Sequence, residues 1–178
     1  YQTSARFVPL VHSSHPNQLL RKLGVPHDPD LPISVAFGRV ALQRGWKRGS
    51  KKWKKNWNTC MNSEYDRIIG CRVSSLATWQ GLCTKVGIED SFASINQCKK
   101  VMPRFEQSNI TYPLLYVELS HVHVNIVDLL DSWGTDATPV RFKNTKAIAT
   151  YTKSNQKFFG RHIAQQDKAL RVLLRKLL

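Results

Sequence analysis

The densest group of residues that could perform chemistry lies in the second half of the chain. His121 and His123 alternate along a short apolar segment, which would place both imidazoles on one face of a strand, where they can bind zinc. A metal-dependent nuclease would also need a water-activating group and a positioned carboxylate. The spacing of Glu118, Asp128 and Asp131 provides neither. We therefore expect histidines at a strand end and carboxylates at helix caps, with no metal site and with the nuclease as the least favoured alternative.

The four cysteines are spaced unlike metal ligands. They are separated by 11, 12 and 15 residues, and none forms the close pair that is typical of zinc ribbons and fingers. Cys60, Cys83 and Cys98 fall on the apolar faces of expected helices, as buried free thiols do. Free thiols favour a reducing, intracellular compartment. Two disulfides in a secreted protein, which would include Cys71, are the alternative.

Basic residues give the chain a formal net charge of +15, and two segments carry this excess. Residues 39–55 contain eight basic residues and no acidic residue, whereas residues 141–178 contain ten basic residues and one acidic residue. Charge that serves only solubility does not need to be concentrated in this way. We therefore expect a surface that attracts a polyanion, first of all nucleic acid. The residues expected to hold phosphate are Arg44, Lys47, Arg48, Lys51, Lys52, Lys54 and Lys55.

A helix must carry the four lysines. The sequence predicts one that is capped by Ser50, runs to about Ile69 and is followed by Gly70. Apolar residues recur along it at intervals of three and four and form one stripe. The stripe consists of Trp53, Trp57, Cys60, Met61, Tyr65 and Ile68. Because the lysines fall off this stripe, the tryptophans should face the core and the lysines the solvent.

Residues 75–103 predict two helices joined by a short turn. Cys83 and Gly87 have the spacing of the small residue and the turn glycine of a helix-turn-helix, and Ile95 and Cys98 match the buried pair of its second helix. The inward residues of the first helix, which Ser75 should cap, are Leu76, Trp79, Leu82, Cys83 and Val86. The base-reading candidates are Ser94, Asn96, Gln97, Lys99 and Lys100. An ordinary helix pair of the core is the alternative, which acidic residues at positions 89 and 90 favour because they would repel phosphate.

Other segments complete the predicted fold. Residues 1–33 are rich in proline and histidine and predict an extended arm, with one helical turn near Asn17–Leu23. Ser34 should cap a helix that runs to about Arg44, and its inward residues should be Val35, Phe37, Val40 and Ala41. Residues 114–124 alternate as a short strand. Asn125 should begin a further helix, and Thr145 should cap another one, which would direct Ile148 and Tyr151 inward.

Residues 161–178 predict an amphipathic helix with a basic face. Its candidate partner-binding residues are Leu170, Leu173, Leu174 and Leu177. The helix can pack on the domain, dock to a partner protein, or lie on an anionic membrane, and the absence of aromatic residues at the tail disfavours the membrane. A docking helix would make the chain an interaction subunit of a larger assembly or a homo-oligomer, which is the main alternative function.

Several short motifs resemble those of an uncharacterised set of short hypothetical fungal proteins. The motifs are GW-x2-GS at 45–50, EYDRIIG at 64–70, LATWQGLC at 76–83, SINQCKK at 94–100 and VHVNIVDLL at 122–130. The resemblance covers most of residues 35–178. It implies a fungal, intracellular origin, and it implies no activity, cofactor or catalytic residue.

Together these patterns predict a mainly α, compact helical domain over residues 34–178, with a helix-turn-helix-like pair and one minor β element. No phosphate-binding glycine loop, nucleophile elbow or paired-carboxylate motif occurs, so we expect a protein that is not an enzyme and has no cofactor. No apolar run approaches the roughly 18 residues of a membrane span. We expect a nucleic-acid-binding protein with no membrane partner, and we favour DNA over RNA as its ligand. We expect the protein to be intracellular, and specifically nuclear.

Overall fold

Seven helices and one small sheet make up the part of the chain that the computed structural model describes, namely residues 17–25, 28, 31–70, 74–87, 92–101, 123–133 and 135–160. The helices are α1 (Gln18–Lys22), α2 (Ile33–Gln43), α3 (Lys51–Ile68), α4 (Leu76–Lys85), α5 (Ile95–Val101), α7 (Ile126–Ser132) and α8 (Thr145–Asn155). The strands β1 (His123–Val124) and β2 (Arg141–Phe142) pair antiparallel, with His123 opposite Phe142. The prediction of a mainly helical fold with one minor β element is confirmed.

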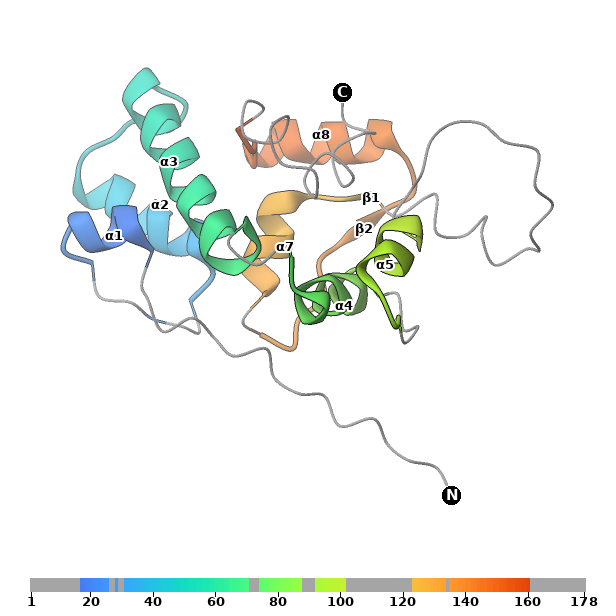
Figure 1. Cartoon of the computed structure of the whole chain (residues 1–178). Coiled ribbons are helices and arrows are strands. Elements are labelled where there is room, and N and C mark those ends of the chain that lie inside the picture. The colour runs from blue at the N-terminus through green and yellow to red at the C-terminus, as the bar shows by residue number, and fades with distance from the viewer. Residues whose placement is uncertain are drawn as a thin grey trace.

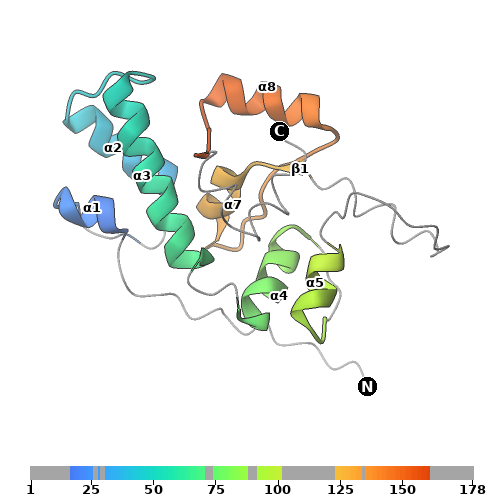
Figure 2. The ribbon, with the colours of Figure 1, turned by 45° about the horizontal axis from the view of Figure 1, so that its top comes forward.

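The helices form two groups, and α7 lies between them (Figures 1 and 2). At one end α1 and α2 pack against α3, and at the other end α4 packs against α5. α7 contacts both α2 and α3, whereas α8 lies along the two-stranded sheet. The helical turn predicted near Asn17–Leu23 is α1, and its Leu20 is buried in the core.

An aromatic cluster between α2 and α3 forms the centre of the core. Phe37 of α2 is fully buried and meets Trp53 and Trp57 edge-on, with ring centroids 5.6 and 5.3 Å apart. The two indoles stack with their centroids 5.0 Å apart. Ring quadrupoles favour edge-on and offset-stacked arrangements of this kind. All six residues of the predicted apolar stripe of α3 are buried, so this prediction is confirmed.

One carboxylate lies within the buried stripe of α3, where the sequence analysis placed only apolar residues. Glu64 is buried and accepts hydrogen bonds from Asn17 Nδ2 at 3.0 Å and from Arg67 Nε at 3.0 Å. The buried Asn17 amide also donates to the carbonyl of Cys60 at 3.0 Å. These bonds anchor the middle of the predicted N-terminal arm, at Asn17, to α3.

The start of α2 differs from the prediction. The N-cap residue is Pro32 and not Ser34, and α2 has no capping hydrogen bond from the side chain of its N-cap residue. Ser34 lies in the first turn, where its N–H and its hydroxyl donate to the Asp131 carboxylate at 2.9 and 2.6 Å. As a result Ala36 faces the core, whereas Val35, which was predicted to face inward, is 44% exposed. A carboxylate 97 residues away thus does what a local N-cap would do.

The predicted helix pair is present as α4 and α5. All but one of the inward residues predicted for the first helix are buried, and Leu76 is half-buried. Gly87 has φ +72° directly after α4, as a turn glycine should. Nine residues, 86–94, separate α4 from α5, whereas a DNA-binding helix-turn-helix has a turn of about three or four residues. Cys98 is fully buried and Ile95 is half-buried.

Asparagines cap the two helices of the second half. Asn125 Oδ1 accepts a hydrogen bond from the N–H of Val127 at 2.9 Å, as the predicted helix start requires. Asn144 caps α8 by accepting from the N–H of Ala147 at 2.8 Å, so the prediction of Thr145 as the cap is wrong by one residue. The inward residue Ile148 is buried.

Some predictions concern residues that lie outside the described ranges. They include most of the N-terminal arm, the strand up to residue 122, Cys71, Glu118, His121, and the C-terminal helix with Leu170, Leu173, Leu174 and Leu177. The other three cysteines are buried free thiols, as predicted. None of the helices in the described ranges has the length and apolar character needed to cross a membrane.

Candidate nucleic-acid interface

The turn between α2 and α3 fixes the first part of the basic segment. The N–H of Gly45 donates to the carbonyl of Leu42 at 3.0 Å, and the N–H of Trp46 donates to that of Ala41 at 2.8 Å. With Gly45 at φ +63°, these two bonds form a Schellman motif, which ends a helix at a left-handed residue. Gly49, at φ +80°, provides a second reversal before α3 begins. The basic side chains of this turn are therefore held on a defined backbone.

All seven residues predicted to hold phosphate are exposed in this region. They are Arg44, Lys47 and Arg48 of the turn and Lys51, Lys52, Lys54 and Lys55 at the start of α3. The lysines lie off the buried stripe of α3, as predicted. The seven cations thus lie within twelve consecutive residues, 44–55, which we call the basic segment.

The second basic part of the sequence approaches the basic segment at the end of α8. Arg48 donates to the carbonyl of Asn155 at 2.6 Å, and the side chain of Gln156 lies close to Gly49. Further along α3, the Trp57 indole donates to the carbonyl of Phe158 at 2.7 Å. These contacts bring the exposed Lys153 of the last turn of α8 towards the basic segment. The sequence around Lys153 does not predict this proximity, which depends on how the end of α8 packs against the turn and α3.

Four other cations of the described ranges bind acceptor groups of the protein itself. Arg67 pairs with Glu64, Lys157 pairs with Asp128 and Asp131, Lys85 donates to the carbonyls of Thr135 and Ala137, and Arg141 donates to that of Val86. Burial lowers the pKa of Lys85, although the charge of Asp136 acts in the opposite direction. By contrast, no residue of the basic segment forms a salt bridge with a carboxylate in the described part of the chain.

The sequence around the basic segment contains no acidic residue. Neither Asp nor Glu occurs between Asp30 and Glu64, and none occurs between Asp136 and Asp167. The two acid-free stretches are the ones that meet where α3 begins and α8 ends. Sequence neighbours therefore add no negative charge to this surface, whose positive potential can concentrate a polyanion within a Debye length of about 8 Å at physiological ionic strength.

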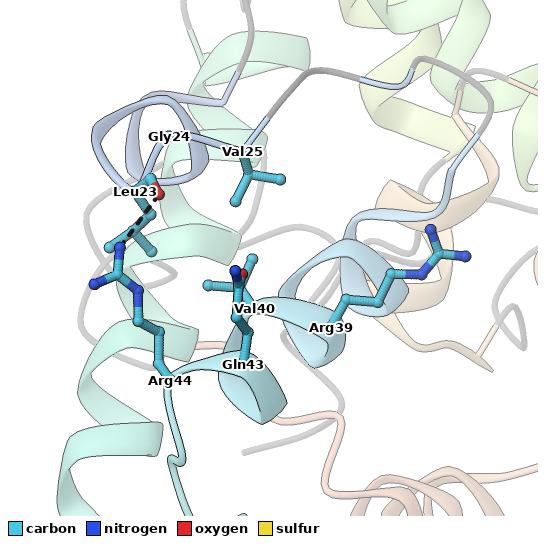
Figure 3. A pocket seen from close by; sticks show the side chains of 7 residues that line it. All are labelled: Leu23, Gly24, Val25, Arg39, Val40, Gln43 and Arg44. Carbon is cyan, nitrogen blue, oxygen red and sulfur yellow. Dashed lines mark hydrogen bonds between the residues drawn. The ribbon is translucent and has the colours of Figure 1, made fainter.

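A pocket of about 470 Å³ lies beside the basic segment, between the end of α1 and α2. Figure 3 shows that Arg44 turns back on one rim to donate to the carbonyl of Leu23, at 3.3 Å, whereas Arg39 extends away on the other side. Val25 and Val40 form apolar wall between them, next to the Gln43 amide. Because the two guanidinium groups point apart, they do not form a common anion site.

The base-reading candidates of α5 have other roles or lie elsewhere. Ser94 Oγ accepts from the N–H of Gln97 at 3.2 Å, and Gln97 Oε1 accepts from the N–H of Ser94 at 3.1 Å. This is a capping box, which occupies both side chains in starting α5. Asn96 is exposed, whereas the side chains of Lys99 and Lys100 are not among those described. Figures 1 and 2 show α5 at the opposite end of the molecule from the start of α3.

The carboxylates that suggested a metal site serve an ionic network. Lys157 Nζ donates to Asp128 and, at 3.2 Å, to Asp131, which also binds the start of α2. Burial alone would lower the pKa of Lys157, but its bonds to both carboxylates and their charges outweigh burial and raise it. Burial, and next the bond to Asp128, raise the pKa of Tyr151. In the described residues, no three His, Cys, Asp or Glu side chains gather as metal ligands would.

The basic segment includes one aromatic residue that sequence analysis did not single out. Trp46 is half-buried and lies between Gly45 and Lys47, with Lys52 Nζ 5.8 Å from its ring centroid. An aromatic residue among consecutive basic residues was the available signal.

Comparison with known proteins adds no relative, because no family model, curated protein or solved structure matches the chain.

Proposed function

We propose that this protein binds nucleic acid by holding the phosphate backbone on the basic segment. One observation carries this proposal: seven exposed cations lie together on a fixed turn and one helix, and none is neutralised by a described carboxylate. Phosphate neutralisation by such lysines and arginines supplies the sequence-independent part of nucleic-acid affinity. The end of α8, which carries the exposed Lys153, contacts the same turn through Asn155.

The position of the lysines on α3 supports a functional reason for them. The positive end of the helix dipole lies at the N-terminus, where acidic residues stabilise a helix and basic residues oppose it by about 0.3–1 kcal/mol each. The first turn of α3 contains no acidic residue, whereas Lys51, Lys52 and Lys54 lie at its start. Lysines at the N-terminus of α3 thus lower the stability of the free protein, but they and the helix dipole both attract an anion that binds there.

Backbone binding is better supported than base reading by α5. The side chains of Ser94 and Gln97 are engaged in capping, and the linker before α5 is longer than a helix-turn-helix turn. Contacts to phosphate position a protein on nucleic acid but carry no sequence information. We therefore expect little discrimination between sequences.

A salt titration tests the proposal. If all seven cations contact phosphate, the logarithm of the affinity should fall against the logarithm of salt concentration with a slope of about −6 for duplex DNA and about −5 for a single strand. A variant with four substitutions should reduce the duplex slope to about −3. The four substitutions are Lys51→Gln, Lys52→Gln, Lys54→Gln and Lys55→Gln.

A matched variant separates a located surface from net charge alone. It removes four exposed cations elsewhere and lowers the net charge by the same amount. Its substitutions are Arg21→Gln, Lys22→Gln, Lys143→Gln and Lys146→Gln. This control should keep most of the affinity and of the slope. Affinity that does not depend on salt, or an equal loss in both variants, would refute the proposal.

A further inference from the structure

The α2–α3 turn presents a partly exposed indole in the middle of the basic segment. Trp53, Trp57 and Trp79 are at most 7% exposed, whereas Trp46 is half-buried. The Trp57 indole N–H donates to a carbonyl, and that of Trp46 has no acceptor among the described residues. Trp46 therefore differs from the core tryptophans in exposure, and from Trp57 also in hydrogen bonding.

The backbone around Trp46 holds the ring at the boundary between core and solvent. Trp46 follows the left-handed Gly45, and its N–H closes the Schellman motif on α2. Its ring lies against the fully buried Phe37, with centroids 6.1 Å apart and planes tilted by 42°. The exposed Lys52, in the first turn of α3, has its ammonium nitrogen 5.8 Å from the centroid of the ring. An aromatic surface that is fixed in this way loses little conformational freedom when a ligand stacks on it.

We propose that Trp46 is a stacking platform for an unpaired nucleobase, and that the protein therefore prefers single-stranded nucleic acid. This inference rests on the proposed function of the basic segment. Bases in a duplex stack on each other, so only unpaired bases can offer a ring face to a protein side chain. A positively charged surface with an aromatic residue within it is the arrangement by which proteins bind single strands without reading their sequence.

Lys52 can exchange its contact with the Trp46 ring for a contact with phosphate when a base stacks on the ring. In the free protein its ammonium group lies near the Trp46 ring, where the ring quadrupole attracts a cation. A nucleobase that stacks on the indole can displace the ammonium group, which then becomes available to the phosphate of the same nucleotide. The cations that follow Trp46 in the sequence, Lys47 and Arg48, can hold the neighbouring phosphates.

Substitution of Trp46 tests the inference, because stacking requires an unpaired base, whereas phosphate contacts form with both single strands and duplexes. The probes are a labelled 12-nucleotide strand of mixed sequence, as DNA and as RNA, and the 12-base-pair DNA duplex. Trp46→Leu keeps an apolar side chain against Phe37 but removes the indole. It should weaken binding of the single strands by about 5- to 150-fold, the range for loss of one stacked base, and change duplex binding by less than about twofold. Trp46→Phe should retain most of the single-strand affinity.

Fluorescence and a matched tryptophan provide the controls. Binding of a single strand should quench part of the tryptophan emission, and this quenching should be lost in Trp46→Leu. Trp133→Leu removes another half-buried indole, at the end of α7, and should leave both affinities unchanged. Equal weakening of strand and duplex, or no weakening of either, would overturn the stacking role. If neither ligand binds in a salt-dependent way, the proposed function itself fails.

The DNA and RNA arms distinguish the source of the unpaired base. Stacking uses the ring face, which both polymers have, so the effect of Trp46→Leu should be similar in the two arms. A loss that occurs with only one polymer would contradict recognition through the ring face and would overturn the inference, since a sugar contact would then be responsible.

Discussion

Substitution of Lys157 by methionine should destabilise the protein strongly. Lys157 follows α8, and its ammonium group donates to Asp128 and Asp131 of α7. Asp131 also accepts two hydrogen bonds from Ser34 at the start of α2. One lysine therefore links three helices that are far apart in the sequence. Methionine keeps a similar length and the apolar stem but removes the charge.

The burial of the three side chains sets the magnitude. Lys157 is 23% exposed, and the carboxylates of Asp128 and Asp131 are 9% and 12% exposed. Removal of one partner from a buried ion pair costs about 3–5 kcal/mol, because the remaining charge has lost its compensation. Since Asp131 keeps its bonds to Ser34, we expect the lower end, about 3 kcal/mol. For a domain of this size that loss corresponds to a fall in Tm of about 6–12 °C.

Urea unfolding at pH 7, followed by far-ultraviolet circular dichroism, measures this change. Lys153→Met is the matched control, because Lys153 is an exposed lysine of the same helix end with no described carboxylate partner. Its free energy of unfolding should stay within about 0.5 kcal/mol of the wild-type value. If Lys157→Met costs less than about 1 kcal/mol, or if both variants lose equally, the network does not stabilise the fold as argued.

The pH dependence has a definite sign. The pKa of Lys157 is raised above its ordinary value of 10.5, so the native state holds this proton more tightly than the unfolded chain. The stabilisation is therefore complete below that value and is lost as the pH rises through the higher native pKa. The stability difference between wild type and Lys157→Met should be constant near neutrality and should narrow above about pH 10.5. A difference that stays constant through this alkaline range would contradict the assignment.

Three further substitutions and one chemical modification test other parts of the structure. Gly87→Ala should lower the free energy of unfolding in urea by about 2 kcal/mol, because φ is +72° and the new methyl group would displace the Arg141 guanidinium. Gly38→Ala, which places its methyl group in open space on α2, should instead raise the free energy of unfolding by about 0.5–1 kcal/mol. Ser94→Ala should cost about 1 kcal/mol through loss of its cap and leave nucleic-acid affinity unchanged, so that weaker binding without destabilisation would indicate base reading. Cys60, whose pKa burial raises, should resist alkylation at pH 8 until urea unfolds the protein, and peptide mapping of modified cysteines would detect earlier reaction.

Elements with local start and stop signals were predictable from the sequence. Ser50 caps α3 by accepting from the N–H of Trp53 at 3.2 Å, and the apolar residues that follow lie on one face. The exposure of the lysines follows from the same periodicity. Ser94 also caps α5, and Gly87 adopts the left-handed conformation of a turn. In each case the relevant interaction joins residues within one helical turn.

Features that depend on tertiary contacts were not predictable in the same way. α2 lacks a cap of its own and receives the carboxylate of Asp131, so the assignment of Ser34 as the cap was wrong. Glu64 is buried within an apolar stripe because Asn17 and Arg67 satisfy its oxygens. The pattern of one segment does not reveal a polar partner that another segment supplies. The same reason explains why the approach of α8 to the basic segment became visible only in the fold.

The distribution of carboxylates connects the stability of the fold with the proposed function. The buried acids Glu64 and Asp128, with Asp131 beside them, are all used within the protein, and their bonds run to Arg67, Lys157 and the start of α2. A single carboxylate moved into residues 44–55 would pair with a lysine there and oppose an incoming phosphate at the same time. These three acids cap and bridge helices, and the lysines at the start of α3 form no salt bridge with a carboxylate of the described residues. On the proposed function, the lysines at the start of α3 can therefore bind a polyanion without breaking a salt bridge of the described residues.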